Sequence, residues 1–186
     1  MSKSKVARRS EPPRRLILGI DPGVALVGYA LIAEQQGRLE CLACDVIATP
    51  ARTPLQHRLQ LIYQGISRVI LTYHPQEAAM EKLFFGQNRT TGMAVGHARG
   101  VIMLALADGG LTIDEYTPSQ VKQAVTGHGG AKKPQVGEMV RILLGLPSVP
   151  RPDDAADAAA VAICHAHTSH LRQLVKSQER PLVPVR

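Results

Sequence analysis

The sequence of 186 residues predicts one mixed α/β domain with a central sheet flanked by helices. Three apolar segments with the pattern of strands stand near the N-terminus, and each is bounded by turn residues. Farther along, two shorter strand-like segments alternate with stretches of helical period. A chain of this length can bury a sizeable core, and it contains no visible internal repeat.

The first strands are expected at residues 16–21, 26–34 and 38–48, with Gln36-Gly37 as the hairpin turn between the second and the third. A long helix follows, because Thr53-Pro54-Leu55-Gln56 combines an N-cap, a proline at the first helical position and a capping-box glutamine. The core-facing side of this helix is formed by residues at helical spacing: Leu55, Leu59, Ile62, Ile66, Val69 and Tyr73.

In the second half, Pro75 ends the helix and Ala78-Ala79-Met80-Glu81 predicts a buried strand. A helix at about 89–107 carries the small residues Gly92, Gly96 and Gly100, which we expect to pack inside the protein rather than at a dimer seam. The remaining elements follow from caps and breaks: a strand at 111–116, a helix from Thr117-Pro118-Ser119-Gln120, a flexible basic loop at 127–133, a helix at 134–144 and a final helix from Pro152 to about His170.

The net charge of +7 is typical of nucleic-acid-binding proteins, but its distribution is uneven. Residues 1–15 contain six basic residues and one acidic residue, and residues 173–186 contain three and one. The tails therefore hold the whole excess. We expect a basic disordered tail at 1–15, a folded domain at 16–172 and a C-terminal tail at 173–186.

The composition also indicates in which cellular compartment the protein is expected. The apolar stretches are too short for a transmembrane helix, and no apolar segment follows the basic N-terminus as a secretory signal requires. Three cysteines argue against a disulfide framework and favour a cytoplasmic protein. Cys41 and Cys44 are not expected to bind zinc, because residues three apart in a strand point to opposite faces and no second pair is present.

Carboxylates occur where predicted strands and one helix begin or end. Asp21 follows the first strand directly, where it could cap the Pro-Gly turn or serve as a metal ligand or general base. Glu81 ends the fourth strand. Asp154 and Asp157 share one face of the final helix, whereas Asp153 is the candidate for interaction with the helix dipole.

Two strand ends and a helix start can converge at one edge of a sheet. Carboxylates gathered there would repel one another by roughly 4 kcal/mol per pair at about 4 Å in an effective dielectric of about 20. Such a cluster needs cations, and oxygen ligands suit Mg²⁺ or Mn²⁺ better than Zn²⁺. Two such ions can support phosphodiester hydrolysis.

These residues resemble the RuvC family of crossover junction endodeoxyribonucleases, the bacterial Holliday junction resolvases. The resemblance rests on five segments in the right order: GIDPG at 19–23, MEKLF at 80–84, ARG at 98–100, VKQ at 121–123 and DAADA at 154–158. It implies a ribonuclease H-like fold with a central mixed five-stranded sheet. It also implies that Asp21, Glu81, Asp154 and Asp157 are the catalytic metal ligands, for two Mg²⁺ or Mn²⁺ ions, although some relatives have His in place of Asp154.

The same resemblance implies DNA contacts. Phe84 is expected to wedge or stack against bases near the junction, which could contribute about 1–3 kcal/mol per base. Lys122 and Lys133 correspond to lysines near the scissile phosphate. Further candidates for backbone contact are Arg89, Arg99 and Lys132.

The family acts on four-way junction DNA in recombination and repair, as a homodimer that cuts two opposed strands in the bacterial cytoplasm, and RuvA and RuvB are its implied branch-migration partners. Three alternatives remain open from the residues alone: a ribonuclease H-like nuclease that processes RNA, an actin-like or sugar-kinase-like ATPase, and a junction-binding protein without catalysis.

Overall fold

The computed structural model describes residues 14–82 and 89–178, with side chains described in 14–82 and 92–169. Within these residues the chain forms one five-stranded sheet, in the order β3-β2-β1-β4-β5, and five helices, as expected. The elements are β1 Arg15–Asp21, β2 Leu26–Gln35, β3 Arg38–Ala48, α1 Leu55–Tyr73, β4 Glu77–Glu81, α2 Arg89–Asp108, β5 Thr112–Tyr116, α3 Pro118–Thr126, α4 Lys133–Leu143 and α5 Asp153–Gln178.

The sheet is mixed. The strands β1, β2 and β3 pair antiparallel, and Gln36 and Gly37 between β2 and β3 both have positive φ, which confirms the predicted hairpin turn. The strands β1, β4 and β5 pair parallel, and Ile20 lies opposite Met80. The residues that follow this pair, Asp21 and Glu81, therefore leave the sheet at the same edge.

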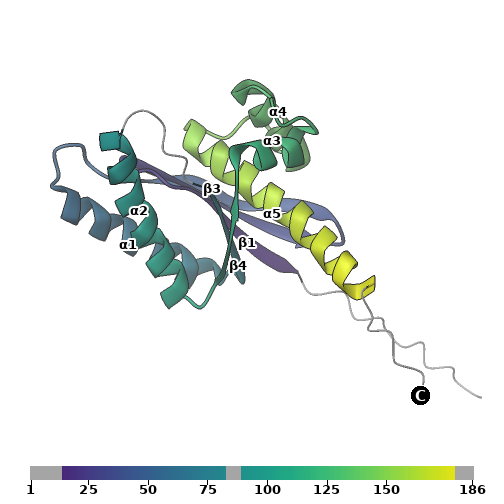
Figure 1. Cartoon of the computed structure of the whole chain (residues 1–186), viewed down its shortest axis with the longest axis horizontal. Helices are drawn as coiled ribbons and strands as arrows, with labels where there is room; N and C mark the ends of the chain where they lie inside the picture. Colours follow the sequence, from purple (N-terminus) through teal and green to yellow (C-terminus); the bar gives the residue numbers. More distant parts are fainter. Residues whose placement is uncertain (1–13, 83–88, 179–186) are drawn as a thin grey trace, which may run out of the picture.

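The helices cover both faces of the sheet. In Figure 1, α1 and α2 lie on one side, and α5 crosses the other side with α3 and α4 beside its N-terminal half. Each face has its own buried cluster: α1 and α2 contribute Ile62, Ile66 and Ile102 to one, and α5 contributes mainly alanines to the other. No helix in the described ranges is both long and apolar enough to cross a membrane.

The N-terminal half of α5 lies directly against β1 and β2 because two glycines leave room for it. A Cβ on Gly19 would collide with the carbonyl oxygen of Ala158, and a Cβ on Gly28 would collide with that of Asp154. The alanines of α5 that face the sheet, such as Ala155 and Ala162, are fully buried. This close approach fixes where the first turns of α5 stand relative to the ends of β1 and β4.

A buried polar network holds α5 at the other end of the sheet. Arg15 binds both carboxylate oxygens of Glu77, at 2.9 and 2.7 Å. The Glu77 carboxylate is also hydrogen-bonded to His165 Nε2 on α5 at 2.6 Å, and Nδ1 of the same ring lies 2.9 Å from the Tyr116 hydroxyl. Arg15 and His165 together keep the pKa of Glu77 below its usual value, with the Arg15 hydrogen bonds as the largest cause.

The two predicted helix caps have different outcomes. Thr117 caps α3 with a complete capping box to Gln120, as predicted. At α1 the prediction is wrong, because the helix begins at Leu55 and its N-cap is Pro54, which makes no side-chain cap hydrogen bond. Thr53 instead donates its N–H to Pro50 in a preceding turn.

The ends of the folded domain also differ from the expected boundaries. Arg15, assigned to the N-terminal tail, is the first residue of β1, and Arg14 forms an ion pair with Glu40. At the other end, α5 continues to Gln178 rather than ending near His170. The helix therefore extends past position 172, where the folded domain was expected to end.

Two predictions from the sequence are wrong, one about the direction of the cysteine side chains and one about the packing of α2. A β-bulge in β3 leaves Leu42 without a paired residue, so that Cys41 and Cys44 both pack against the buried cluster on the α5 face of the sheet. On α2, a Cβ added at Gly96 or Gly100 would meet no atom within 4 Å among the described residues. These two glycines therefore do not serve the internal helix packing that we expected.

We expect Gly28→Ala to destabilise the protein by about 1–3 kcal/mol, because the new methyl group must push α5 away from β2. Chemical denaturation would measure the loss. Gly137→Ala on α4 is the control, since its Cβ would press only on the end of the Val149 side chain, at 3.0 Å, and it should cost clearly less than Gly28→Ala. Equal stability of the two variants would contradict the close-approach argument.

Candidate active site at the edge of the sheet

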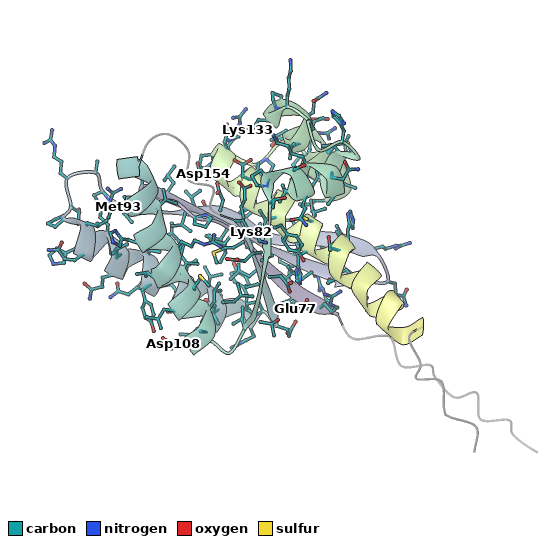
Figure 2. All side chains as sticks on the ribbon, viewed as in Figure 1. Glu77, Lys82, Met93, Asp108, Lys133 and Asp154 are labelled. Atoms are coloured by element: carbon teal, nitrogen blue, oxygen red, sulfur yellow. The ribbon has the colours of Figure 1, made fainter. Side chains whose placement is uncertain are left out.

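Asp21 and Glu81 are half-buried at the ends of the adjacent parallel strands β1 and β4. They line one small cavity of about 180 Å³, together with Pro22, Lys82 and Arg99. Figure 2 shows Lys82 at the end of β4 opposite to Glu77. The parallel pairing thus brings together the first two predicted site residues.

Asp154 and Asp157 are both half-buried in the first turns of α5. Asp157 lines a second cavity of about 270 Å³, which it shares with Glu81, Lys122 and Lys133. The main chain of Asp154 packs on Gly28 of β2. The close approach of α5 to the sheet therefore brings the helix carboxylates to the edge where Asp21 and Glu81 emerge.

The charges of the other three carboxylates all act on Asp21. Burial and then the charges of Asp157, Glu81 and Asp154 raise the pKa of Asp21 to about 7, and Lys133 opposes this rise. Burial and the charge of Asp157 likewise raise the pKa of Glu81. Negative charge at this edge is unfavourable unless a cation compensates for it.

Lys133 supplies part of that compensation. Its Nζ lies 2.8 Å from Asp157 Oδ2 and 3.5 Å from Asp153 Oδ2, and the hydrogen bond to Asp157 is the largest cause that raises the pKa of Lys133. The loop prediction for Lys133 is wrong, because this residue is the first of α4. Figure 2 shows Lys133 and Asp154 at the same end of α5.

The other predicted DNA contacts have different outcomes. Lys122 on α3 is half-buried and lowers the pKa of Glu81 by its charge. Lys132 is the exposed N-cap of α4, and its N–H donates to Gln135 Oε1 at 2.8 Å. Phe84 lies outside the described residues, and Arg89 begins α2 but its side chain also lies outside them.

Lys82 and Arg151 are site residues that the sequence prediction missed. Lys82 is exposed and lines the cavity of Asp21 and Glu81. Its position directly after Glu81 is a signal that could have indicated this. Arg151 is exposed and forms an ion pair with Asp153, so Asp153 is engaged by two cations rather than by the helix dipole alone.

The donor set of this site fits divalent cations. Four carboxylates provide the hard oxygen ligands that Mg²⁺ and Mn²⁺ prefer, and a bound cation would offset the burial and the like charges that raise the pKa of Asp21. Among the residues with described side chains, no three His, Cys, Asp or Glu groups are already gathered closely enough to hold one ion. Metal binding at this edge would therefore draw carboxylates together.

Comparison with known proteins assigns the family. The sequence profile of "Crossover junction endodeoxyribonuclease RuvC" matches residues 17–165. Proteins of that name from Heliobacterium modesticaldum and Desulfitobacterium hafniense are 56% and 53% identical over 82% and 84% of this chain, and each alignment covers 94% of the relative. RuvC of T. thermophilus, solved in complex with a Holliday junction substrate, superposes with a TM-score of 0.81 at 34% identity and covers 85% of this chain and 96% of its own.

A more distant protein shows how widely the fold is shared. The yeast mitochondrial Holliday junction resolvase is 15% identical and superposes with a TM-score of 0.64 over 91% of this chain and 89% of its own. The ribonuclease H-like fold, the carboxylate edge and the close relatives agree with one another. This chain belongs to the RuvC family of crossover junction endodeoxyribonucleases, which are metal-dependent nucleases.

Proposed function

We propose that this protein is a structure-selective endonuclease that resolves four-way DNA junctions by cutting two opposed phosphodiester bonds in recombination and repair. The observation that carries the proposal is the edge where Asp21, Glu81, Asp154 and Asp157 influence one another beside Lys122 and Lys133. The names of the close relatives and the junction complex of T. thermophilus RuvC support the choice of substrate.

We further propose that the four carboxylates hold two Mg²⁺ or Mn²⁺ ions. When bound, such ions lower the pKa of water and stabilise the charge of an in-line phosphoryl displacement. Lys133 must then exchange its ion pair with Asp157 for a DNA phosphate, which its exposed position at the start of α4 permits. Lys122 stands across the same cavity and can neutralise a second phosphate oxygen.

A symmetric junction requires two active sites, so we propose a homodimer. The face of α2 is the candidate interface, because Met93, Met103 and Leu104 are exposed there and a Cβ on Gly96 or Gly100 would meet no described atom within 4 Å. Figure 2 shows Met93 on the side of the molecule away from α5, so this face is separate from the carboxylate edge. RuvA and RuvB remain the proposed partners, and we propose the bacterial cytoplasm as the location because chromosomal DNA lies there.

Substitution of single carboxylates tests the function directly. Asp21→Asn and Asp157→Asn should lower divalent-dependent junction cleavage by about 10³-fold or more, while junction binding persists, because the ligand charge is lost but the fold is not. Gel cleavage and fluorescence anisotropy would measure the two effects.

Wild-type protein on linear duplex and RNA is the substrate control. Equal cutting of linear duplex would contradict junction selectivity, and preferred cutting of RNA would support a processing nuclease. Detectable ATP turnover that survives Asp21→Asn would support the ATPase alternative. Full junction resolution by Asp157→Asn would contradict the catalytic assignment.

The pKa of Asp21 predicts how pH changes the stability of the metal-free protein. The folded-state value of about 7 exceeds the value of about 3.9 for an unfolded Asp, so stability falls as pH rises from about 4 to about 7. In EDTA, Asp21→Asn should melt about 4–8 °C above wild type at pH 8, and the gap should shrink toward pH 4. Asp45→Asn controls for the loss of a carboxylate elsewhere, and a gap independent of pH would contradict the prediction.

The dimer proposal predicts that Leu104→Glu yields monomers, because a charge would be buried at the interface. Sedimentation would distinguish 20.1 kDa from twice that mass. On a supercoiled plasmid with a cruciform, the variant should produce nicked circles in place of linear product. Ile142→Glu, which changes an exposed residue of α4, should remain dimeric, and a dimeric Leu104→Glu protein would contradict the assignment of this face.

A further inference from the structure

Arg99 connects α2 to the end of the strand that carries Glu81. Its Nη1 donates a hydrogen bond to the main-chain oxygen of Glu81 at 2.5 Å, and its Nη2 forms an ion pair with Glu115 on β5. Only 12% of the Arg99 side chain is exposed. The guanidinium thus joins α2, β4 and β5, and Arg99 lines the same cavity as Glu81 and Asp21.

Arg99 binds one of the two polar atoms of a single peptide group, the carbonyl oxygen of Glu81. The carbonyl of Glu81 and the N–H of Lys82 belong to the same planar unit, and that N–H donates to the main-chain oxygen of Tyr116 at 2.7 Å. With both polar atoms of this peptide engaged, its plane is fixed. The backbone of Glu81 can then rotate little, and the direction in which its side chain leaves the strand is set.

The same contacts argue against a phosphate-binding role for Arg99. Its charge is compensated by Glu115 and its side chain is largely removed from solvent, whereas the Lys133 side chain is 57% exposed. Turning the guanidinium fully toward a phosphate would break its bonds to the Glu81 main chain and to Glu115. Such an exchange is costly for a desolvated ion pair.

We infer that Arg99 is a positioning residue, which orients Glu81 for metal binding through the main chain; this inference rests on the proposed nuclease function. Partners that orient metal ligands typically change metal affinity or activity by 10–100-fold when they are removed. Glu115 acts one step farther away, because its loss removes the ion pair but leaves the bond from Arg99 to Glu81.

The experiment compares Arg99→Gln, Arg99→Lys and Glu115→Gln with wild type, and Arg68→Gln on the exposed side of α1 is the matched control for charge. Calorimetric titration measures Mn²⁺ affinity without DNA. Fluorescence anisotropy without divalent ions measures junction affinity and its dependence on salt, and single-turnover cleavage measures the chemical step.

For Arg99→Gln we expect Mn²⁺ affinity and cleavage rate to fall at least about tenfold, with junction affinity and its salt slope unchanged. Arg99→Lys, which keeps one donor and the charge, should recover part of the loss, and Glu115→Gln should have a smaller effect. Arg68→Gln should match wild type.

Weaker junction binding with a shallower salt slope would show that Arg99 contacts phosphate, and would overturn the inference. Unchanged Mn²⁺ affinity in Arg99→Gln would overturn it as well. If both Arg99 variants failed to fold while Glu115→Gln kept full Mn²⁺ affinity, Arg99 would be assigned to stability alone. Failure of the wild type to cleave junctions would contradict the proposed function, which is a separate outcome.

Discussion

The contact between the backbone of α5 and the backbones of β1 and β2 is the constraint on which the site depends. Gly19 and Gly28 lack the atoms that would hold the helix away, and the alanines of α5 complete a surface that a larger side chain would interrupt. Because the strand ends and α5 both carry carboxylates of the site, a small change in the distance between α5 and the sheet would alter the distances between these carboxylates. On this face α5 contributes mainly alanines, whose small side chains permit the close approach although each buries little apolar area, while Ile17, Ile32 and Tyr116 supply larger buried side chains.

The site itself is a place where the fold accepts unfavourable charge. Burial and the charges of three other carboxylates raise the pKa of Asp21 to about 7, and Lys133 relieves only part of this cost. Proteins tolerate such local conflicts where function requires them and compensate elsewhere. Lys133 serves as a counter-ion within the chain, so the protein can fold before a metal ion or DNA binds.

Much of this arrangement could be predicted from the sequence, because the signals are local or depend on one rule of sheet geometry. The positions of Asp21 and Glu81 after adjacent strands required only strand pattern and parallel pairing. The failures depend on tertiary context. The same Thr-Pro-x-Gln arrangement caps α3 at Thr117 but does not cap α1 at Thr53, since the preceding chain turns differently there. A β-bulge cannot be placed from hydrophobic period alone, and no local signal connects Arg99 to the main chain of Glu81.

The short strand β4 begins and ends with a glutamate, and the two differ in how their charges are balanced. Glu77 has Arg15 and His165 as fixed partners and a lowered pKa, whereas burial first, and then the charge of Asp157, raise the pKa of Glu81. As the medium becomes acidic, protons therefore bind first at the reactive end of the strand. The Glu77 carboxylate at the other end, bound by Arg15 and His165, keeps its charge until the pH falls through the lower pKa of Glu77. Until then it also keeps the stability that it contributes. Moderate acid should consequently inactivate the enzyme reversibly while its fold stays intact. Inactivation and unfolding are therefore expected at different pH values.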